Sequence, residues 1–579
     1  MSRTVFLFIL VGGFVASVFP GCRCASGSEQ NQTDNIENEN GNETETTGDA
    51  WVDGVLPEAV TQIEGAEPRE GGEITVHIHT EPPSLCTARH SDLMATRVTK
   101  HKIYEMLLRV DPYDHPDYNF QPELAEALPE ISEDGLVHTL RLRQGVKWHD
   151  GEEFNADDVI ASYDVIRHEE TLTDHMNSYL EELDSYEKID DHTIRFTWKR
   201  PYFLALDVYE LVPIMPEHVL STCEGADFNE ATTNPLMRHP VGTGPWKFIE
   251  WESHERIVVE RFDDYWGDKP HLEKITFRII EDSNVPVQLA ERGELDIVTR
   301  IPSAEWADMD SQYIKDNYHR SRFQENNYAW IGWNMERPFF SDKRVRQALT
   351  MLVDKEGIMG SILQGLPLPT NCHFYAPRAE CDFEHEPWPY DPVRATRLLD
   401  EAGWTDSNND GTRDKDGVEF SFTFMLPSSS REAGQWLTKI KEDFERAGVD
   451  LNIQRVEWAI FTRRLREHDF DACTLLWGDT SPRTDPNQIW HSSSAEGGSN
   501  YVSFKNDRVD EIIEQARVTL DDDARLALYR EFGQILQEEQ PYTWMYSRPR
   551  LSLVHTRLRG VRESLGWYVF RDWWIADES

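Results

Sequence analysis

Runs in which apolar and polar residues alternate occur at intervals along most of the chain and predict β-strands. The clearest runs span residues 74–79, 138–142, 193–198, 257–260 and 275–280. A period of two residues is typical of a strand that buries one of its faces. Segments with helical periodicity separate these runs, and this alternation of the two periods predicts an α/β fold class.

Two of the helical segments have recognisable ends. In the segment that starts at Pro392, we expect Asp391 to cap the free amides and Gly403 to provide the left-handed stop. A second helix is predicted from 432 to 447, with its large apolar residues on one face and Gly448 at its end. Apolar faces of this kind indicate packing against a core.

The first 21 residues have the pattern of an export signal. Arg3 precedes an apolar run from 5 to 19, which suits the apolar region of a signal peptide and is short for a membrane span. The run leads into Phe-Pro-Gly-Cys, which resembles a bacterial lipobox and makes Cys22 the predicted site of lipidation. Ordinary cleavage near residues 24–27, which would release the protein, is the alternative.

Residues 22–70 are predicted to form a disordered acidic tether. Asn, Glu, Gly and Thr dominate this segment, so it lacks the apolar surface that folding requires. Residues 71–577 contain no repeat and no second low-complexity stretch, and are expected to form the globular body. With Cys22 lipidated, the tether holds this body at the outer face of the cytoplasmic membrane. Either form of cleavage predicts a periplasmic or extracellular location.

Composition supports a large folded body and excludes some partners. Of the 579 residues, 39% are apolar and 19 are Trp, which indicates an extensive core. The formal net charge of −47 argues against binding of nucleic acid or anionic lipid, because both carry negative charge. We expect a monomer without a cofactor.

Five cysteines follow the export region, and none belongs to a CxxC pair or to a zinc-like cluster with histidine. In an oxidising compartment, Cys372 and Cys381 are placed to close a short loop, and Cys86 is a candidate partner for Cys223. The sequence leaves both pairings open.

Five separated segments match a known family in content and order. They are LRQGVKWHDG at 142–151, VGTGPW at 241–246 followed by DYWG at 264–267, GELDI at 293–297, DKRVRQAL at 342–349, and LWGD at 476–479. Together they resemble bacterial extracellular solute-binding proteins of family 5, the dipeptide-, oligopeptide- and nickel-binding components of ABC importers. Read without the family, VGTGPW supplies glycines and a proline suited to a tight turn.

The resemblance implies a periplasmic-binding-protein-like fold of two α/β lobes, joined by a hinge of two chain crossings. We expect the crossings near 326–334 and 542–549. The implied first lobe comprises 71–325 and 549–579, with an extra subdomain at about 112–238, and the second lobe comprises 326–548. Ligand that bridges both lobes would favour the closed form.

The resemblance also implies ligand contacts in the second lobe. Asp479 matches the aspartate that pairs with a peptide α-amino group, a contact that burial at closure strengthens. Trp477 is placed to pack on the ligand. The alternatives are that Asp479 caps a turn near Pro482 and that Trp477 belongs to the core.

Further candidate contacts lie at two other positions. Ser429, Ser430 and Arg431 stand where a strand leads into a helix, and are candidates for binding a peptide carboxylate. His90 belongs to a first-lobe loop that lies where relatives touch ligand, although its residue types differ from theirs.

The expected function is capture of a small solute, foremost a di- or oligopeptide, and its delivery to the permease and ATPase subunits of an ABC transporter. Two alternatives within the family stay open. The many aromatic residues are compatible with oligosaccharide binding. His77 and His79, two apart on a predicted strand, and His385 between two glutamates are candidates for a nickel or metal-chelate site.

A loop after the helix at 392 resembles the first part of a calcium-binding loop. Its candidate ligands are Asp406, Asn408, Asp410 and Asp414, but Gly417 stands where an EF-hand has its bidentate glutamate. A plain hairpin loop is the alternative. An exported hydrolase is the competing class of protein, and the absence of GxSxG and HExxH signatures argues against an enzyme.

Overall fold

The computed structural model describes residues 67–90, 92–114, 117–374, 378–381, 388–428, 430–479, 481–496, 498–562, 564–565 and 568–576. The predicted signal peptide, Cys22, nearly all of the predicted tether, Ser429 and His385 lie outside these residues. No helix within them is long and apolar enough to cross a membrane.

The first lobe is built on a seven-stranded mixed sheet. Its strands are, in spatial order, β12 (Tyr318–Gln324), β21 (Pro549–His555), β11 (Ile297–Val298), β1 (Glu73–Ile78), β10 (Lys274–Ile279), β9 (Arg256–Arg261) and β8 (Trp246–Glu252). The central strand β1 runs parallel to β10, and Val76 lies beside Phe277. Both side chains are fully buried in the core of this lobe.

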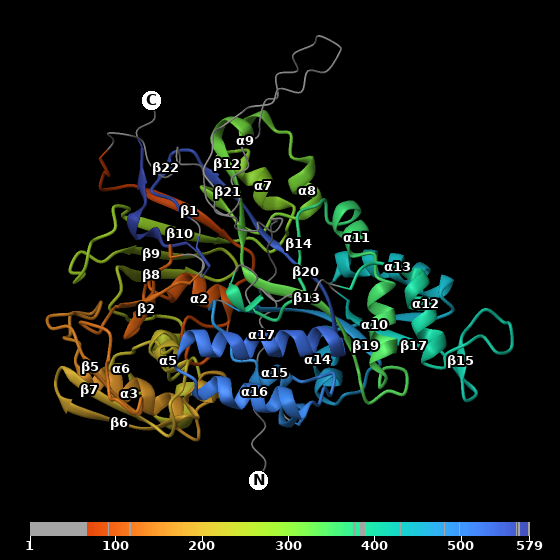
Figure 1. Cartoon of the computed structure of the whole chain (residues 1–579). Coiled ribbons are helices and arrows are strands. Elements are labelled where there is room, and N and C mark those ends of the chain that lie inside the picture. The colour runs from red at the N-terminus through yellow and green to blue at the C-terminus, as the bar shows by residue number, and fades with distance from the viewer. Residues whose placement is uncertain are drawn as a thin grey trace, which may run out of the picture.

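A smaller antiparallel sheet belongs to the same side of the molecule. Its order is β4 (Glu130–Ile131), β5 (Val137–Arg141), β7 (Thr193–Trp198) and β6 (Leu183–Asp190). Helix α3 (Ala156–Arg167) packs on β6, and both contribute to a separate core cluster. This sheet lies within the segment predicted as a subdomain, and Figure 1 shows it at the lower left.

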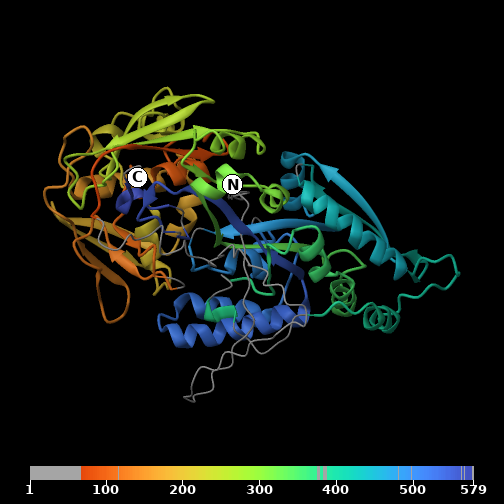
Figure 2. The ribbon, with the colours of Figure 1, turned by 90° about the horizontal axis from the view of Figure 1, so that it is seen from above.

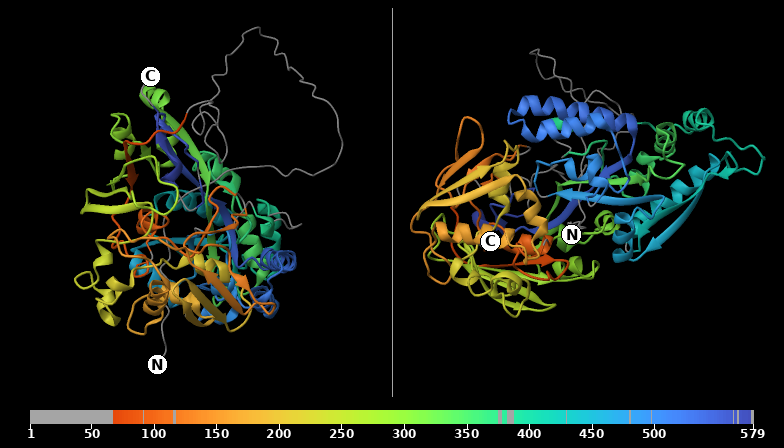
Figure 3. Two further views of the ribbon diagram at one scale, coloured as in Figure 1. Left: turned by 90° about the vertical axis from the view of Figure 1, so that its left-hand side faces the viewer. Right: turned by 90° about the horizontal axis from the view of Figure 1, so that it is seen from below.

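The second lobe is built on a six-stranded sheet. The spatial order is β14 (Leu368–Pro369), β20 (Tyr542–Ser547), β13 (Asn326–Trp333), β19 (Ala472–Asp479), β17 (Ser421–Pro427) and β18 (Asp450–Val456). The helices around it include α10 (Lys343–Met351), α12 (Pro392–Glu401), α13 (Arg431–Arg446), α16 (Asp507–Val518) and α17 (Asp522–Glu539). Helices α16 and α17 lie side by side along this lobe (Figure 3).

The chain passes between the two large sheets at two adjacent points. Glu325 alone separates β12 from β13, and Arg548 alone separates β20 from β21. In the first lobe Gln324 pairs with Pro549, and in the second lobe β13 pairs with β20, so the crossings run together. Figure 2 shows the first lobe on one side of these strands and α13 on the other. These positions agree with the expected hinge, and the exact lobe bounds stay a prediction.

The predicted elements and helix ends agree with the structure. Each of the five strand runs overlaps a strand of one of the first-lobe sheets. Asp391 accepts a hydrogen bond from the amide of Arg394, as an N-cap should, and Gly403 takes a φ of +88° after the helix. Gly448 has a φ of +78° beyond α13.

The turn at 242–245 differs from its sequence interpretation. Neither Gly242 nor Gly244 has positive φ. A Cβ on Gly242 would lie 1.8 Å from the carbonyl oxygen of Ile103, and one on Gly244 would lie 2.3 Å from that of Lys102. These glycines therefore serve close packing of two backbones, rather than a special turn conformation.

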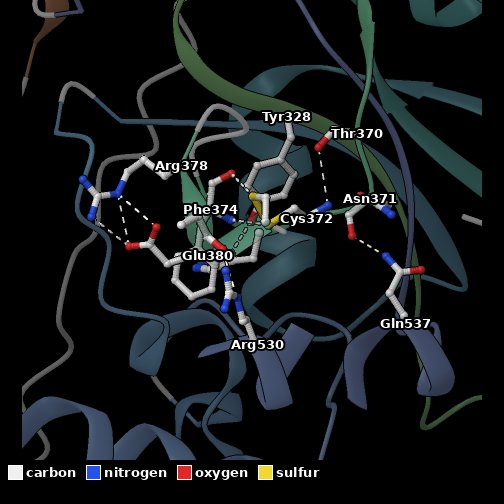
Figure 4. The surroundings of a disulfide bond; sticks show 12 residues. Tyr328, Thr370, Asn371, Cys372, Phe374, Arg378, Glu380, Arg530 and Gln537 are labelled. Atoms are coloured by element: carbon white, nitrogen blue, oxygen red, sulfur yellow. Dashed lines mark hydrogen bonds and ion pairs between the residues drawn. A yellow bond between two sulfur atoms is a disulfide. The ribbon is translucent and has the colours of Figure 1, made fainter. Parts of the chain in front are cut away.

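One of the two predicted cysteine pairings is present. Cys372 and Cys381 form a disulfide that closes a short loop in the second lobe. Figure 4 shows how this loop is held: Gln537 donates to the carbonyl of Asn371, and Arg378 forms an ion pair with Glu380 at 3.0 Å. The other pairing was wrong. Cys86 and Cys223 are free thiols, both buried in one core cluster, where apolar packing shields them.

Candidate functional site

A cavity of about 510 Å³ lies between the two lobes. The first lobe contributes His90, Thr96, Lys100, Met106, Asp207 and Glu210 to its lining. The second lobe contributes Asn326, Tyr328, His373, Trp477, Gly478 and Arg483, among others. Its volume is that of a small-ligand pocket, roughly 300–1,000 Å³.

Two central strands of the second lobe, β13 and β19, form part of the cavity wall. Tyr328 on β13 stands directly opposite Trp477 on β19, and both side chains are largely buried. The indole of Trp477 stacks against Trp330 and Tyr501, with ring centroids 5.9 and 6.0 Å apart. This part of the wall is therefore a fixed aromatic surface.

His373 supports Tyr328 from behind. Its Nδ1 lies 2.8 Å from the hydroxyl of Tyr328 and 3.0 Å from the indole nitrogen of Trp490. An indole N–H can only donate, so Nδ1 is the acceptor and the ring proton lies on Nε2. Burial lowers the pKa of His373 to about 3, which keeps this ring neutral.

Strand β19 ends at the cavity. Gly478 lines it and is exposed, which leaves the main chain open to close approach by a ligand. Asp479 is the last residue of the strand, paired with Asn326 at the crossing. The side chain of Asp479 lies outside what the structure describes. Its backbone position at the cavity edge is compatible with the predicted contact.

The first-lobe wall begins with the loop before α2 (Leu93–Thr99). The amide of His90 donates to the carbonyl of Cys86 at 3.2 Å, which folds the loop back. Asp92 caps α2 by accepting from the amide of Ala95 at 2.8 Å. Burial, with smaller contributions from nearby cations, lowers the pKa of His90 to about 4, so it is neutral near pH 7.

Helix α5 (Ala205–Leu211) presents two carboxylates to the cavity. Asp207 and Glu210 are three residues apart and therefore share a face. Glu210 contacts Nζ of Lys100 at 2.5 Å and Nε2 of His101 at 3.4 Å. Burial alone would raise the pKa of Glu210, but these cations outweigh it and lower the pKa to about 2. Glu210 is therefore ionised and its charge is balanced within the first lobe.

Asp207 instead faces the second lobe. Its carboxylate forms an ion pair with Arg483 at 3.0 Å and accepts from the hydroxyl of Ser481 at 3.4 Å. Burial raises the pKa of Asp207, although Arg483 opposes that rise. A more exposed pair, Arg200 with Glu514 at 3.0 Å, also joins the lobes. Both pairs join the two lobes, and the pair of Asp207 with Arg483 does so at the cavity.

The structure brings some of the predicted site residues together. Trp477 and His90 line the cavity from opposite lobes, and Asp479 ends the strand beside it. Arg431 is exposed at the start of α13, and neither it nor Ser430 lines the cavity.

The register of the strands explains why Ser430 and Arg431 lie away from the cavity. Strand β17, which leads into Ser430, runs parallel to β19, and Met425 lies beside Cys473. In this register β17 ends before it reaches the level of Asp479, the last residue of β19. The adjoining Glu432 meets Arg548 at the second crossing and the hydroxyl of Ser303. The predicted carboxylate-binding role of Arg431 therefore has no support from its position.

Sequence reasoning missed Asp207, Glu210, Arg483 and His373. Asp207 and Arg483 are 276 residues apart, and no local pattern marks either one. His373 adjoins Cys372, and the constraint of the disulfide was the one available signal. These residues become visible only when the fold brings the lobes together.

The predicted metal sites find no geometric support. In the part of the chain that the structure describes, no group of three or more His, Cys, Asp or Glu side chains is placed to hold a metal ion. His77 directs its two ring nitrogens to the carbonyls of Thr299 and Ile280. In the calcium-like loop, Asp406 accepts from the amides of Asp410 and Gly411, as in a plain turn.

The chain is similar to known proteins in sequence and in structure. Residues 119–499 match the family described as bacterial extracellular solute-binding proteins, family 5 Middle. The oligopeptide-binding protein AppA of Bacillus subtilis is 30% identical, over 88% of this chain and 93% of its own. The dipeptide-binding protein of Escherichia coli is 28% identical, over 77% of this chain and 83% of its own.

Solved structures of this family have a similar fold. That of AppA from Bacillus subtilis in complex with a nonapeptide has a TM-score of 0.73 at 28% identity, covering 88% of this chain and all of that one. NikA from Brucella suis in complex with Fe(III)-EDTA has a TM-score of 0.75 at 24% identity, covering 87% of this chain and all of that one, and supports the fold alone. The expectation of a non-enzymatic protein is confirmed, since solute binding defines the family. The chain belongs to the bacterial extracellular solute-binding proteins of family 5, the solute-binding components of ABC importers.

Proposed function

We propose that this protein captures a di- or oligopeptide outside the cytoplasmic membrane and delivers it to the permease of an ABC transporter, which works with separate ATPase subunits. The observation that carries the proposal is the cavity between the lobes, lined by both. It offers exposed main chain at Gly478 beside the aromatic wall. Open backbone next to a fixed apolar surface suits an extended peptide, which binds through its own main chain.

Two side chains are proposed to recognise the peptide. Asp479 pairs with its α-amino group, since the two residues before it line the cavity and a charge-assisted pair gains strength when water is excluded. Trp477 packs on the peptide backbone from the second lobe, and His90 contacts it from the first. The names of the oligopeptide- and dipeptide-binding relatives support this ligand class.

We further propose that Cys22 is diacylated and holds the protein at the outer face of the cytoplasmic membrane. The lipobox-like sequence before Cys22 supports the proposal. Metabolic labelling with a radioactive fatty acid tests it: label should enter the wild type and not Cys22→Ala. A labelled Cys22→Ala protein would disprove the assignment.

The ligand class is tested with the full-length protein by thermal shift against peptides, nickel with histidine, and oligosaccharides. Binding to the folded state raises the melting temperature by mass action. We expect stabilisation by peptides that is largely lost in Asp479→Asn. Stabilisation by sugars or by the nickel chelate alone would replace the peptide proposal with that ligand class.

A further inference from the structure

The two lobes also touch beyond the crossings, where the four-stranded sheet of the first lobe meets helices α16 and α17 of the second. The segment 199–204 leads from β7 of this sheet into α5. Within it, the amide of Phe203 donates to the carbonyl of Arg517, in the last turn of α16, at 3.1 Å. Figure 1 shows α16 and α17 with one end beside α5. The lobes are therefore joined by a main-chain hydrogen bond that belongs to neither crossing.

The ring of Phe203 packs on helix α17. It meets the ring of Tyr529 edge-on, with centroids 6.3 Å apart, and the guanidinium of Arg525 lies 5.0 Å from its centroid. Tyr529 is itself buried, and Phe374 of the disulfide loop packs on it with centroids 4.6 Å apart. Phe203 thus meets a surface that the second lobe holds in place by its own contacts.

Neighbouring contacts widen this junction. The guanidinium of Arg517 lies 5.6 Å from the ring centroid of Tyr202 and 3.8 Å from the carboxylate of Glu182. The turn between β4 and β5 also reaches the second lobe, since a Cβ on Gly135 would lie 3.0 Å from a methyl group of Leu520. The exposed pair of Arg200 with Glu514 lies at the same junction and contributes little. Aromatic packing therefore dominates the contact.

Most of this junction lies outside the ligand cavity. Tyr202 and Arg517 are among the described residues that line the cavity, but Phe203, Arg525 and Tyr529 are not. A contact that the ligand does not touch adds the same free energy to the closed form with every ligand and with none. The packing of Phe203 therefore acts on the position of the lobes and not on the choice of ligand.

We propose that segment 200–203 and the adjoining ends of α16 and α17 form a clasp, which favours the closed form of the lobes before any ligand binds. This gives the four-stranded sheet a function, because it carries the first-lobe half of the clasp. The clasp sets the fraction of closed molecules, and it scales the affinity for every ligand by one common factor. The inference goes beyond the proposed function and does not depend on the ligand class.

Single-molecule FRET on the full-length protein, without ligand, tests the clasp. The two dyes are attached to ketone-bearing residues introduced at Ile189 on β6 and Val393 on α12, which are exposed positions on different lobes. The wild type should show an open and a closed population. Phe203→Ala should lower the ratio of closed to open molecules at least threefold, because it removes the ring that packs on α17.

Two further substitutions separate the clasp from a general loss of packing. Phe248→Ala is the matched control, since this ring is also half-buried in the first lobe and packs on His239 there, with centroids 5.4 Å apart. It should leave the ratio as in wild type. Arg525→Met should lower the ratio less than Phe203→Ala does. The double variant should be no more open than Phe203→Ala, because both side chains act through one contact.

Three results would overturn the clasp. They are an unchanged ratio in Phe203→Ala, an equal fall in Phe248→Ala, and a wild type that stays open without ligand. Failure of peptides to stabilise the protein in the thermal-shift experiment would overturn the proposed ligand class alone, because the FRET measurement uses no ligand.

Discussion

The two walls of the ligand cleft are made in different ways. The part of the second-lobe wall that lies on strands is aromatic, with Tyr328 opposite Trp477 and the stack continuing to Trp330 behind it. The first-lobe wall includes charged side chains at or near helix ends, held by ion pairs such as Lys100 with Glu210. A sheet fixes its side chains through the backbone, whereas an ion pair can exchange partners when a ligand arrives. The protein thus offers one rigid and one adaptable surface.

The largest predicted effect concerns the rigid wall. Trp330 is fully buried, and its ring stacks on Tyr542 with centroids 4.0 Å apart. Trp330→Ala should lower the free energy of unfolding by about 3–5 kcal/mol, since it removes a large core side chain and leaves a cavity. Urea denaturation measures this loss. Trp330→Phe, which keeps a ring at the site, should lose clearly less, and equal losses would contradict the stacking argument.

The disulfide is expected to contribute somewhat less to the same wall. Cys372 and Cys381 close a short loop next to His373, the residue that supports Tyr328. Cys381→Ser should lower the free energy of unfolding by about 2.5 kcal/mol, because the unfolded chain regains the freedom of that loop. The control is wild type in dithiothreitol, which should match the variant. If reductant left the wild type as stable as before, the bond would have no such role.

The first lobe should be sensitive to acid through His149. Its Nδ1 accepts from the amide of Gly242 at 3.2 Å, and its Nε2 lies 2.9 Å from the carbonyl of Gly244. Burial lowers the pKa of His149 from 6.5 to about 4. The stabilisation by the neutral ring is therefore complete above pH 6.5 and is lost as the pH falls toward 4.

The corresponding variant is His149→Gln. At pH 5, wild type should have lost about 1–2 kcal/mol of stability at this ring, and the variant should lack that part of the loss. Denaturant titrations at pH 7 and pH 5 give, for each protein, the change in its free energy of unfolding between the two pH values. Identical differences for both proteins would show that this ring does not titrate as proposed.

The smallest effect is expected for the contact between the two walls. Asp207→Asn removes one charge of the largely buried pair with Arg483 and should weaken peptide binding roughly fivefold, about 1 kcal/mol. Glu514→Gln is the matched control, because its pair with Arg200 spans the lobes at a more exposed position. Exposed pairs contribute little, so the control should bind like wild type. If Glu514→Gln weakened peptide binding more than Asp207→Asn did, the exposed pair would matter more than the buried one, against our prediction.

The sequence predicted the fold well because its signals are local. Strand alternation, the cap at Asp391 and the stop at Gly403 each depend on a few neighbouring residues, and the structure confirms them. The ordered segments gave the family and the position of Trp477 in the cleft. Arg431 was placed by its sequence position alone, and the register of β17 against β19 carries it away from the cavity.

The first-lobe wall could not be predicted, since its contacts join residues far apart in sequence. Lys100 and Glu210 are 110 residues apart in sequence, and Asp207 and Arg483 belong to different lobes. In a chain with 105 acidic residues, nothing marks two of them as special. Apolar periodicity carries information about the core, whereas charge pairing across lobes leaves none in the local pattern.

The paired crossings at Glu325 and Arg548 restrict how the lobes can move. Two hydrogen-bonded strands that cross together form a ribbon, which bends across its plane more readily than it twists or stretches. We therefore expect the relative motion of the lobes to be mainly a rotation about a single axis. One distance between a pair of spin labels, one on each lobe, would then define the whole opening coordinate, and a second pair placed elsewhere would report the same angle.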